Sequence, residues 1–128
     1  MKRLRPALLL LCSAVAFVAI FLARSDANPE TVRIIAPGVW FREGDMDQGH
    51  CNNGWIILKD YVLVVDANFP SGAHNIIPKI RALTQKPVRF AFDTHHHGDH
   101  AYGNQVWVEN GATPVAHTGV VEEMKRYE

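Results

Sequence analysis

The sequence predicts a mixed α/β fold, and three observations lead to this class. Short runs of β-branched and aromatic residues alternate with turn residues from position 32 onward. The run Tyr61–Val65 (YVLVV) is continuous enough to be a strand that is buried on both faces. Between Ile76 and Leu83, apolar residues recur at helical spacing instead. Strand-like and helix-like pieces therefore follow one another in a single domain.

Each element has its own local signals. The turn pair Pro37-Gly38 separates two short apolar runs, which predicts a leading hairpin. Residues 42–54 are polar and rich in glycine, which predicts a loop. Ser71 is an expected N-cap for the helix, and Pro78 fits its first turn if the regular helix begins near Asn75. The predicted strands are 32–35, 39–41, 55–58, 61–65, 88–92 and 113–116, and a second helix is expected from 120 to 127.

Residues 1–27 have the composition of an export signal. Three basic residues near the start precede an apolar run at residues 7–23, and Ser25 and Ala27 have the spacing that a signal peptidase recognises. The alternative interpretation is an uncleaved membrane anchor formed by residues 7–23. We therefore expect an exported protein, periplasmic or secreted, in which residues 28–128 form one small domain.

The charge balance excludes some classes of partner. The formal net charge is zero, and no block of lysine and arginine follows the signal, so the sequence predicts no nucleic-acid binding. Contact with a membrane is expected only if the N-terminal segment is uncleaved. Cys51 is the only cysteine that would follow the cleavage site, so no internal disulfide is expected.

The chemistry is concentrated in residues 94–104, which read THHHGDHAYGN. His95, His97, Asp99 and His100 have the spacing H-x-H-x-D-H and directly follow a predicted strand. His95 and His97 can converge on one ion, while Asp99 and His100 can reach a second. Imidazole nitrogen and carboxylate oxygen are the usual ligands of zinc. The motif therefore predicts a site for one or two zinc ions.

Such a site would activate water. Bound metal lowers the pKa of a water ligand to about 7, and the resulting nucleophile can attack a carbonyl. Asp99 is the candidate catalytic residue, because it can bind metal and orient this nucleophile, and Gly98 allows the tight turn between ligands. The competing interpretation is a polar loop that binds metal incidentally. That interpretation does not explain an aspartate and a fourth histidine at ligand spacing.

These residues resemble the H-x-H-x-D-H signature of the metallo-β-lactamase superfamily. The segments NNGWIIL, YVLVVDA and VRFAFDT resemble the strands that precede the signature in this family. The resemblance implies a metallo-β-lactamase-type αββα sandwich of two similar halves, of which this chain covers about the first. A missing C-terminal half is then expected to supply the remaining ligands and complete the site.

The resemblance also implies individual roles. His95 and His97 would bind the first zinc, Asp99 and His100 would bind the second, and His96 would not be a ligand. The supporting residues would be Asp66, Thr94, Gly98 and Asn104, with Asp66 behind the site loop.

Four other residues have simpler expected environments. His50 and His74 are expected to be exposed. Trp40 and Tyr102 are expected in the core or at its rim, and the alternative for these two is a wall that faces the substrate.

The predicted function is hydrolysis of a small-molecule ester, thioester or amide, including a β-lactam, by an exported zinc enzyme. Histidine at position 100, where the best-known zinc β-lactamases tend to carry arginine, also resembles glyoxalase II-like branches. Two alternatives belong to other classes. The first is an inactive, truncated metal-binding fragment, since the motif alone offers few ligands. The second is an iron-dependent oxygenase of the same fold, because related sulfur dioxygenases use iron with similar histidines.

Overall fold

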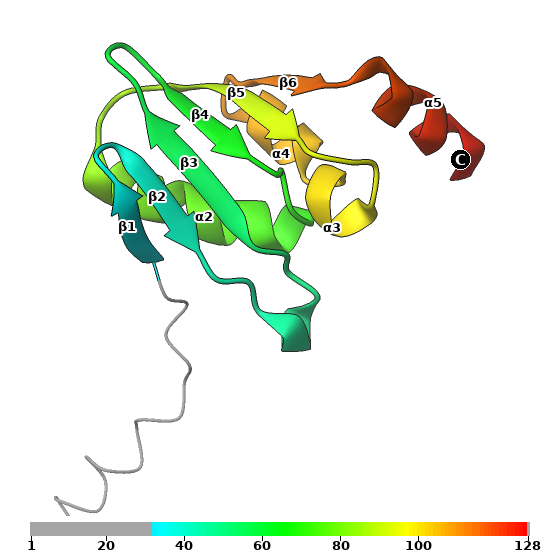
Figure 1. Cartoon of the computed structure of the whole chain (residues 1–128), viewed down its shortest axis with the longest axis horizontal. Coiled ribbons are helices and arrows are strands. Elements are labelled where there is room, and N and C mark those ends of the chain that lie inside the picture. Colours follow the sequence, from blue (N-terminus) through cyan, green and yellow to red (C-terminus); the bar gives the residue numbers. More distant parts are fainter. Residues whose placement is uncertain (1–31, 128) are drawn as a thin grey trace, which may run out of the picture.

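The computed structural model describes residues 32–127, so the predicted export signal at 1–27 lies outside the described residues. Figure 1 shows a twisted sheet with helices behind it. The strands are β1 (Val32–Ala36), β2 (Val39–Arg42), β3 (Asn53–Ile57), β4 (Val62–Val65), β5 (Val88–Asp93) and β6 (Thr113–Ala116). The helices are η1 (Met46–Gln48), α2 (Pro70–Leu83), α3 (Gly98–Ala101), α4 (Asn104–Glu109) and α5 (Thr118–Tyr127).

The strand order in the sheet is the order of the sequence, β1-β2-β3-β4-β5-β6. The first four strands pair antiparallel, as expected for two consecutive hairpins. β4 pairs with β5 and β5 with β6 in parallel, so each of these connections must cross over, and helices form part of both. The carboxyl ends of β4 and β5 consequently meet at one edge of the sheet, where the histidine-rich loop begins.

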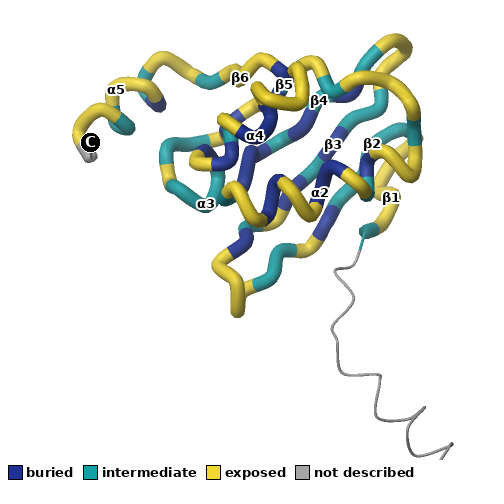
Figure 2. The backbone as a smooth tube through the Cα atoms, turned by 180° about the vertical axis from the view of Figure 1, so that it is seen from behind, coloured by how far each residue is buried: buried dark blue, intermediate teal, exposed yellow. Residues whose placement is uncertain are grey.

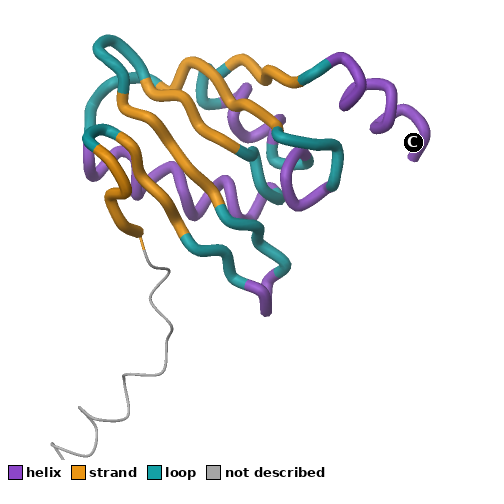
Figure 3. The backbone as a smooth tube through the Cα atoms, in the orientation of Figure 1, coloured by secondary structure: helices purple, strands orange, loops and turns teal. Residues whose placement is uncertain are grey.

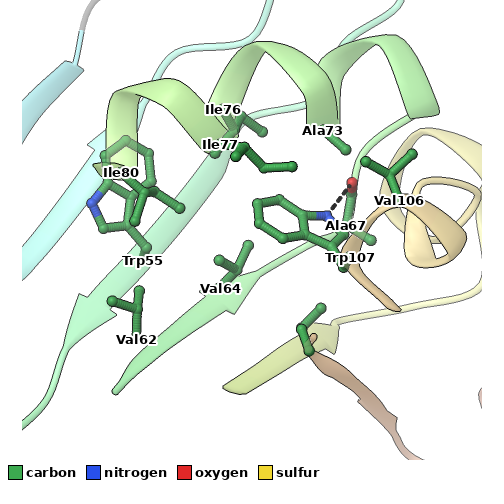
Figure 4. Close-up of a cluster of buried hydrophobic side chains, with 12 residues drawn as sticks. Trp55, Val62, Val64, Ala67, Ala73, Ile76, Ile77, Ile80, Val106 and Trp107 are labelled. Atoms are coloured by element: carbon green, nitrogen blue, oxygen red, sulfur yellow. Dashed lines mark hydrogen bonds between the residues drawn. The ribbon is translucent and has the colours of Figure 1, made fainter. Parts of the chain in front are cut away.

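α2 and α4 pack on the same face of the sheet (Figures 1 and 3). The core lies between these helices and the strands, and Figure 4 shows its side chains. Trp55 and Trp107 are completely buried there, and the Trp107 indole nitrogen donates a hydrogen bond of 2.9 Å to the Ala67 carbonyl. In Figure 2, buried residues are coloured dark blue, and they lie along the strands and along the sides of α2 and α4 that face the sheet. Among residues 32–127, no helix has the length and apolar character needed to cross a membrane.

The structure corrects three expectations about β4 and α2. Val62 and Val64 are buried, but Leu63 and Val65 are only partly buried, because the helices cover one face of the sheet and not both. α2 begins at Pro70 after Phe69, without a side-chain cap, so Ser71 does not cap it. Proline fits the first helical position, where the missing N–H would have no partner. Pro78 therefore lies inside α2, not in its first turn.

The polar loop and the site loop both contain short helices that the sequence did not predict. In residues 42–54, the Asp45 side chain accepts hydrogen bonds from two backbone amides and caps η1. Residues Val106–Val108, too short to assign from sequence, belong to α4. The predicted strand at 113–116 is confirmed, and the predicted final helix begins two residues earlier than expected.

Candidate metal centre

The H-x-H-x-D-H residues occupy a tight turn from β5 into α3. His95, His96 and His97 follow the strand, and His97 has extended backbone angles at the start of α3. Asp99 and His100 lie in the single turn of α3, so their side chains return toward the histidines of the preceding loop. The predicted strand, tight turn and ligand order therefore give one compact cluster at the carboxyl edge of the sheet.

Three of the imidazole rings lie together. The ring centroid of His95 is 4.6 Å from that of His97 and 4.0 Å from that of His100. The ring centroid of His96 is 6.3 Å from that of His95 and 4.8 Å from that of His97. Asp99 joins the cluster, because its Oδ2 atom is 3.3 Å from His100 Nε2. The four predicted ligands are thus neighbours, and the ring of the predicted non-ligand His96 also lies next to that of His97.

The protonation of His95 suits a ligand role. Desolvation lowers the pKa of His95, and the neighbouring His100 and His97 lower it further. A lower pKa keeps the imidazole neutral, which is the form that binds metal. Imidazole and carboxylate donors fit zinc in kind. Within residues 32–127, however, no three histidine, cysteine or acidic side chains are already arranged to hold an ion, so the ligand assignment stays a prediction.

Asp66 connects β4 to the site loop. It is almost fully buried, with a φ of 66°, and its Oδ1 atom accepts hydrogen bonds of 2.8 Å and 2.7 Å from the Thr94 backbone amide and hydroxyl. Its Oδ2 atom is 3.0 Å from His100 Nδ1, a close pair that does not form a hydrogen bond. Asp66 and Thr94 are therefore joined by two hydrogen bonds at the start of the loop, and their supporting role stays a prediction.

Asn104 and Gly98 also contribute to the turn. The Asn104 amide donates a hydrogen bond of 2.6 Å to Asp93 Oδ2, which links α4 to the end of β5. Burial raises the pKa of Asp93, and the nearby Asp66 raises it further. A Cβ atom at Gly98 would lie 2.7 Å from the Tyr102 ring, so glycine lets this ring pack on the backbone.

A network of buried polar side chains lies beside the site, and the sequence did not predict it. The Asn68 amide donates hydrogen bonds to Asn53 Oδ1 (2.7 Å) and to the Cys51 carbonyl (3.1 Å). Asn53 in turn accepts from Arg42 (3.1 Å) and donates to the Asp66 carbonyl (2.7 Å). Asn68 has a φ of 64°, a conformation that asparagine tolerates better than most residues. An asparagine soon after a predicted strand was therefore the feature of the sequence that could have indicated this network.

Two further residues, His50 and Cys51, lie near the site. His50 was expected to be exposed, and this is wrong: it is buried, with Nε2 2.9 Å from Ser71 Oγ. Its loop folds back on the start of α2, which a polar sequence does not reveal. Cys51 is a half-buried free thiol, and burial, followed by the charges of Asp66 and Asp99, raises its pKa to about 12. At neutral pH this thiol is protonated.

Comparison with known proteins identifies this arrangement. The family model described as the metallo-beta-lactamase superfamily matches residues 46–128, which include the whole site loop. The chain belongs to the metallo-beta-lactamase superfamily. A search of curated protein sequences gives no significant match.

Solved structures agree with this superfamily fold. The mono-zinc form of the metallo-beta-lactamase FIM-1 from Pseudomonas aeruginosa matches with a TM-score of 0.64 and 24% identity, over 78% of this chain and 49% of that one. A metallo-beta-lactamase from Hirschia baltica matches with a TM-score of 0.65 and 21% identity, over 78% and 48%. One from Erythrobacter litoralis, with beta mercaptoethanol in its active site, matches with 0.63 and 23%, over 74% and 44%.

The lengths over which the chains match bear on the predicted half of an αββα sandwich. This metallo-beta-lactamase-fold chain spans about half the length of the solved structures that it matches. The described part has one sheet with helices on one face, which is half of an αββα arrangement. The expectation of an α/β fold covering about half of this sandwich is confirmed.

Proposed function

We propose that this protein is an exported zinc-dependent hydrolase that cleaves an ester, thioester or amide bond in a small molecule. The observation that carries the proposal is the clustering of the His95, His97 and His100 rings with Asp99 at the carboxyl edge of the sheet. Membership of the superfamily supports metal-dependent hydrolysis, and the composition of residues 1–27 supports export.

The residues have distinct tasks in this proposal. His95 and His97 would hold the first zinc, and Asp99 and His100 the second. Bound zinc supplies an acidified water that is nucleophilic near neutral pH. The Asp99 carboxylate would accept a hydrogen bond from this water and orient it toward the substrate carbonyl. Asp66 would act through His100, because its carboxylate lies beside the ring nitrogen that faces away from Asp99.

The test combines metal content with hydrolysis of a chromogenic ester by the intact natural protein. We expect stoichiometric zinc, and activity that a chelator removes and zinc restores. His97→Ala should lose bound zinc and activity. His96→Ala, the neighbouring histidine that is not assigned as a ligand, should keep its zinc. His74→Ala, at an exposed position of α2, should keep both zinc and activity.

Other outcomes would contradict the proposal in identifiable ways. Oxygen uptake that depends on iron would indicate the oxygenase alternative. Weak, non-stoichiometric zinc binding by the intact natural protein, without hydrolysis, would indicate an inactive metal-binding fragment. A protein found uncleaved in the membrane fraction would replace export by anchoring through residues 7–23, without affecting the catalytic proposal.

A further inference from the structure

The predicted ligands of the two zinc ions lie on different pieces of the backbone. His95 and His97 precede α3, whereas Asp99 and His100 lie within its single turn. Any displacement of α3 therefore moves Asp99 and His100 together. How firmly this turn is held against the rest of the fold then decides how well these two side chains stay in position for the second ion.

Residues 66–68, which directly follow β4, hold the turn through the backbone. The Ala67 amide donates a hydrogen bond of 2.6 Å to the carbonyl of His100. The next carbonyl along this segment, that of Asn68, accepts a hydrogen bond of 2.6 Å from the Gly103 amide. Segment 66–68 thus binds a predicted ligand residue directly, and it also binds the residue that separates α3 from α4.

The contact between segment 66–68 and the turn leaves no room for a side chain at position 103. A Cβ atom on Gly103 would clash with the Ala67 carbonyl oxygen and would lie 2.7 Å from the carbonyl oxygen of Asn68. Gly103 has a φ of −76°, so its backbone conformation does not itself require glycine. Glycine is needed at this position because the two pieces of backbone approach each other so closely.

The Asn68 side chain fixes the conformation of this segment. Its amide group donates to the Asn53 and Cys51 oxygens, and its Oδ1 atom accepts a hydrogen bond of 2.8 Å from the Phe69 backbone amide. Asn68 is completely buried, and its φ of 64° is one that most residues avoid. The direction of the Asn68 carbonyl follows from its backbone angles, so the bond that this carbonyl accepts from the turn depends on the side chain that holds those angles.

We propose that Asn68 is a positioning residue for the second zinc ion. Its side chain fixes segment 66–68, and this segment holds the α3 turn that carries Asp99 and His100. This inference rests on the hydrolase function proposed above. When a group that supports metal ligands is removed, metal affinity typically falls by about tenfold to a hundredfold. Loss of the Asn68 side chain should therefore weaken the ion at Asp99 and His100.

The first ion has a different support, so the effect should be selective. His95 directly follows Thr94, and the Thr94 amide and hydroxyl both donate hydrogen bonds to the Asp66 carboxylate. The Asp66 amide donates to the Phe92 carbonyl at 2.8 Å, which ties this residue to β5 without the Asn68 side chain. The ion at His95 and His97 should consequently be much less sensitive to a change at position 68.

Stepwise metal titration of the intact natural protein tests this selectivity. The metal-free protein is titrated with Zn²⁺ against a chromogenic chelator, and with Co²⁺, whose visible absorption reports the geometry of each occupied site. Asp99→Ala identifies the step that belongs to the second ion. In Asn68→Gly, which tolerates the backbone conformation, we expect the dissociation constant of the second ion to rise about tenfold or more and that of the first by less than about threefold. Only the cobalt absorption of the second site should change.

Two further variants separate positioning from a general loss of stability. Gly103→Ala disturbs the same contact from the side of the turn, so it should weaken the second ion with the same selectivity. Ile80→Val also destabilises the fold, because Ile80 is buried in the core. Ile80 lies in the last turns of α2, away from the end that adjoins segment 66–68. This variant should leave both dissociation constants unchanged within about twofold.

The outcomes distinguish this inference from the proposed function. Unchanged dissociation constants in Asn68→Gly, equal weakening of both ions, or the same selective weakening in Ile80→Val would overturn the inference and leave the hydrolase proposal intact. A natural protein that hydrolyses its substrate with a single ion at His95 and His97 would overturn it as well. A natural protein without tightly bound zinc and without chelator-sensitive hydrolysis would overturn the hydrolase proposal, and the inference with it.

Discussion

The two faces of the sheet carry similar residues but have different environments. On the face covered by α2 and α4, Trp55, Val64 and Ala91 are completely buried. On the other face, their strand neighbours Ile56 and Val65 are only partly buried, and Phe92 is 38% exposed. An open apolar hollow of about 310 Å³ lies over β2 and β3 on this side, lined by residues such as Val39, Phe41 and Ile56.

The difference shows that the apolar pattern of a strand does not reveal which face of the sheet is covered by helices. YVLVV has apolar side chains on both sides of the strand, as a strand between two layers requires. Residues 32–127 supply helices to one side only. Contiguous exposed apolar surface of this kind marks an interface. The four predictions below test how differently the two faces contribute to stability.

The largest expected effect is on the covered face. Trp107→Ala removes a completely buried indole and its hydrogen bond to Ala67, and we expect it to lower the free energy of unfolding by about 4 kcal/mol. Phe92→Ala, on the open face, should cost about 1 kcal/mol or less, because the Phe92 ring is already partly in water. Urea unfolding of both variants checks this, and equal losses would break the comparison between the faces.

The polar network at the site edge should give the next largest effect. Asn68→Ala leaves the buried Asn53 side chain with one partner fewer and places alanine at a positive φ, so we expect a loss of about 2 to 3 kcal/mol. Asn68→Gly loses the same hydrogen bonds but tolerates the backbone conformation. It should therefore be more stable than Asn68→Ala by about 1 kcal/mol. Equal stability of the two variants in urea would show that φ contributes nothing.

Asp93 tests a carboxyl group on the covered face. Burial raises its pKa, so the folded state favours the protonated form, and stability is lost as pH rises through the pKa of the folded protein. Asp93→Asn keeps an acceptor for the Asn104 amide but cannot ionise. We expect its advantage over the unmodified protein to grow as pH rises above the usual range of aspartate. Thermal unfolding across pH checks this, and parallel curves would contradict it.

The smallest effect on stability is expected on the open face. Phe41→Ser and Phe92→Ser together should lower the fluorescence of a bound apolar dye such as ANS by removing exposed aromatic surface. The free energy of unfolding should change less than in Trp107→Ala. Unchanged dye fluorescence would indicate that the dye binds elsewhere, for example beside Tyr102.

Much of the fold and the site was predictable, for local reasons. The strand at 113–116 and the helix with Ile76, Ile77 and Ile80 in its buried face follow from short-range patterns. The ligand motif is contiguous, so its residues are neighbours in any compact turn. The burial of His50, the role of Asn68 and the raised pKa of Asp93 depend on segments distant in sequence, and local patterns contain no information about those contacts.

The sequence by itself determined the α/β class, the positions of most strands and the candidate ligands His95, His97, Asp99 and His100, because periodicity and ligand spacing are local properties. Only the tertiary structure decided which face of the sheet is covered and which residues support the loop. It also placed the Tyr102 ring beside the predicted ligand His97. The physical reason is that burial, hydrogen bonding and electrostatic fields depend on three-dimensional proximity, which the order of residues along the chain does not specify.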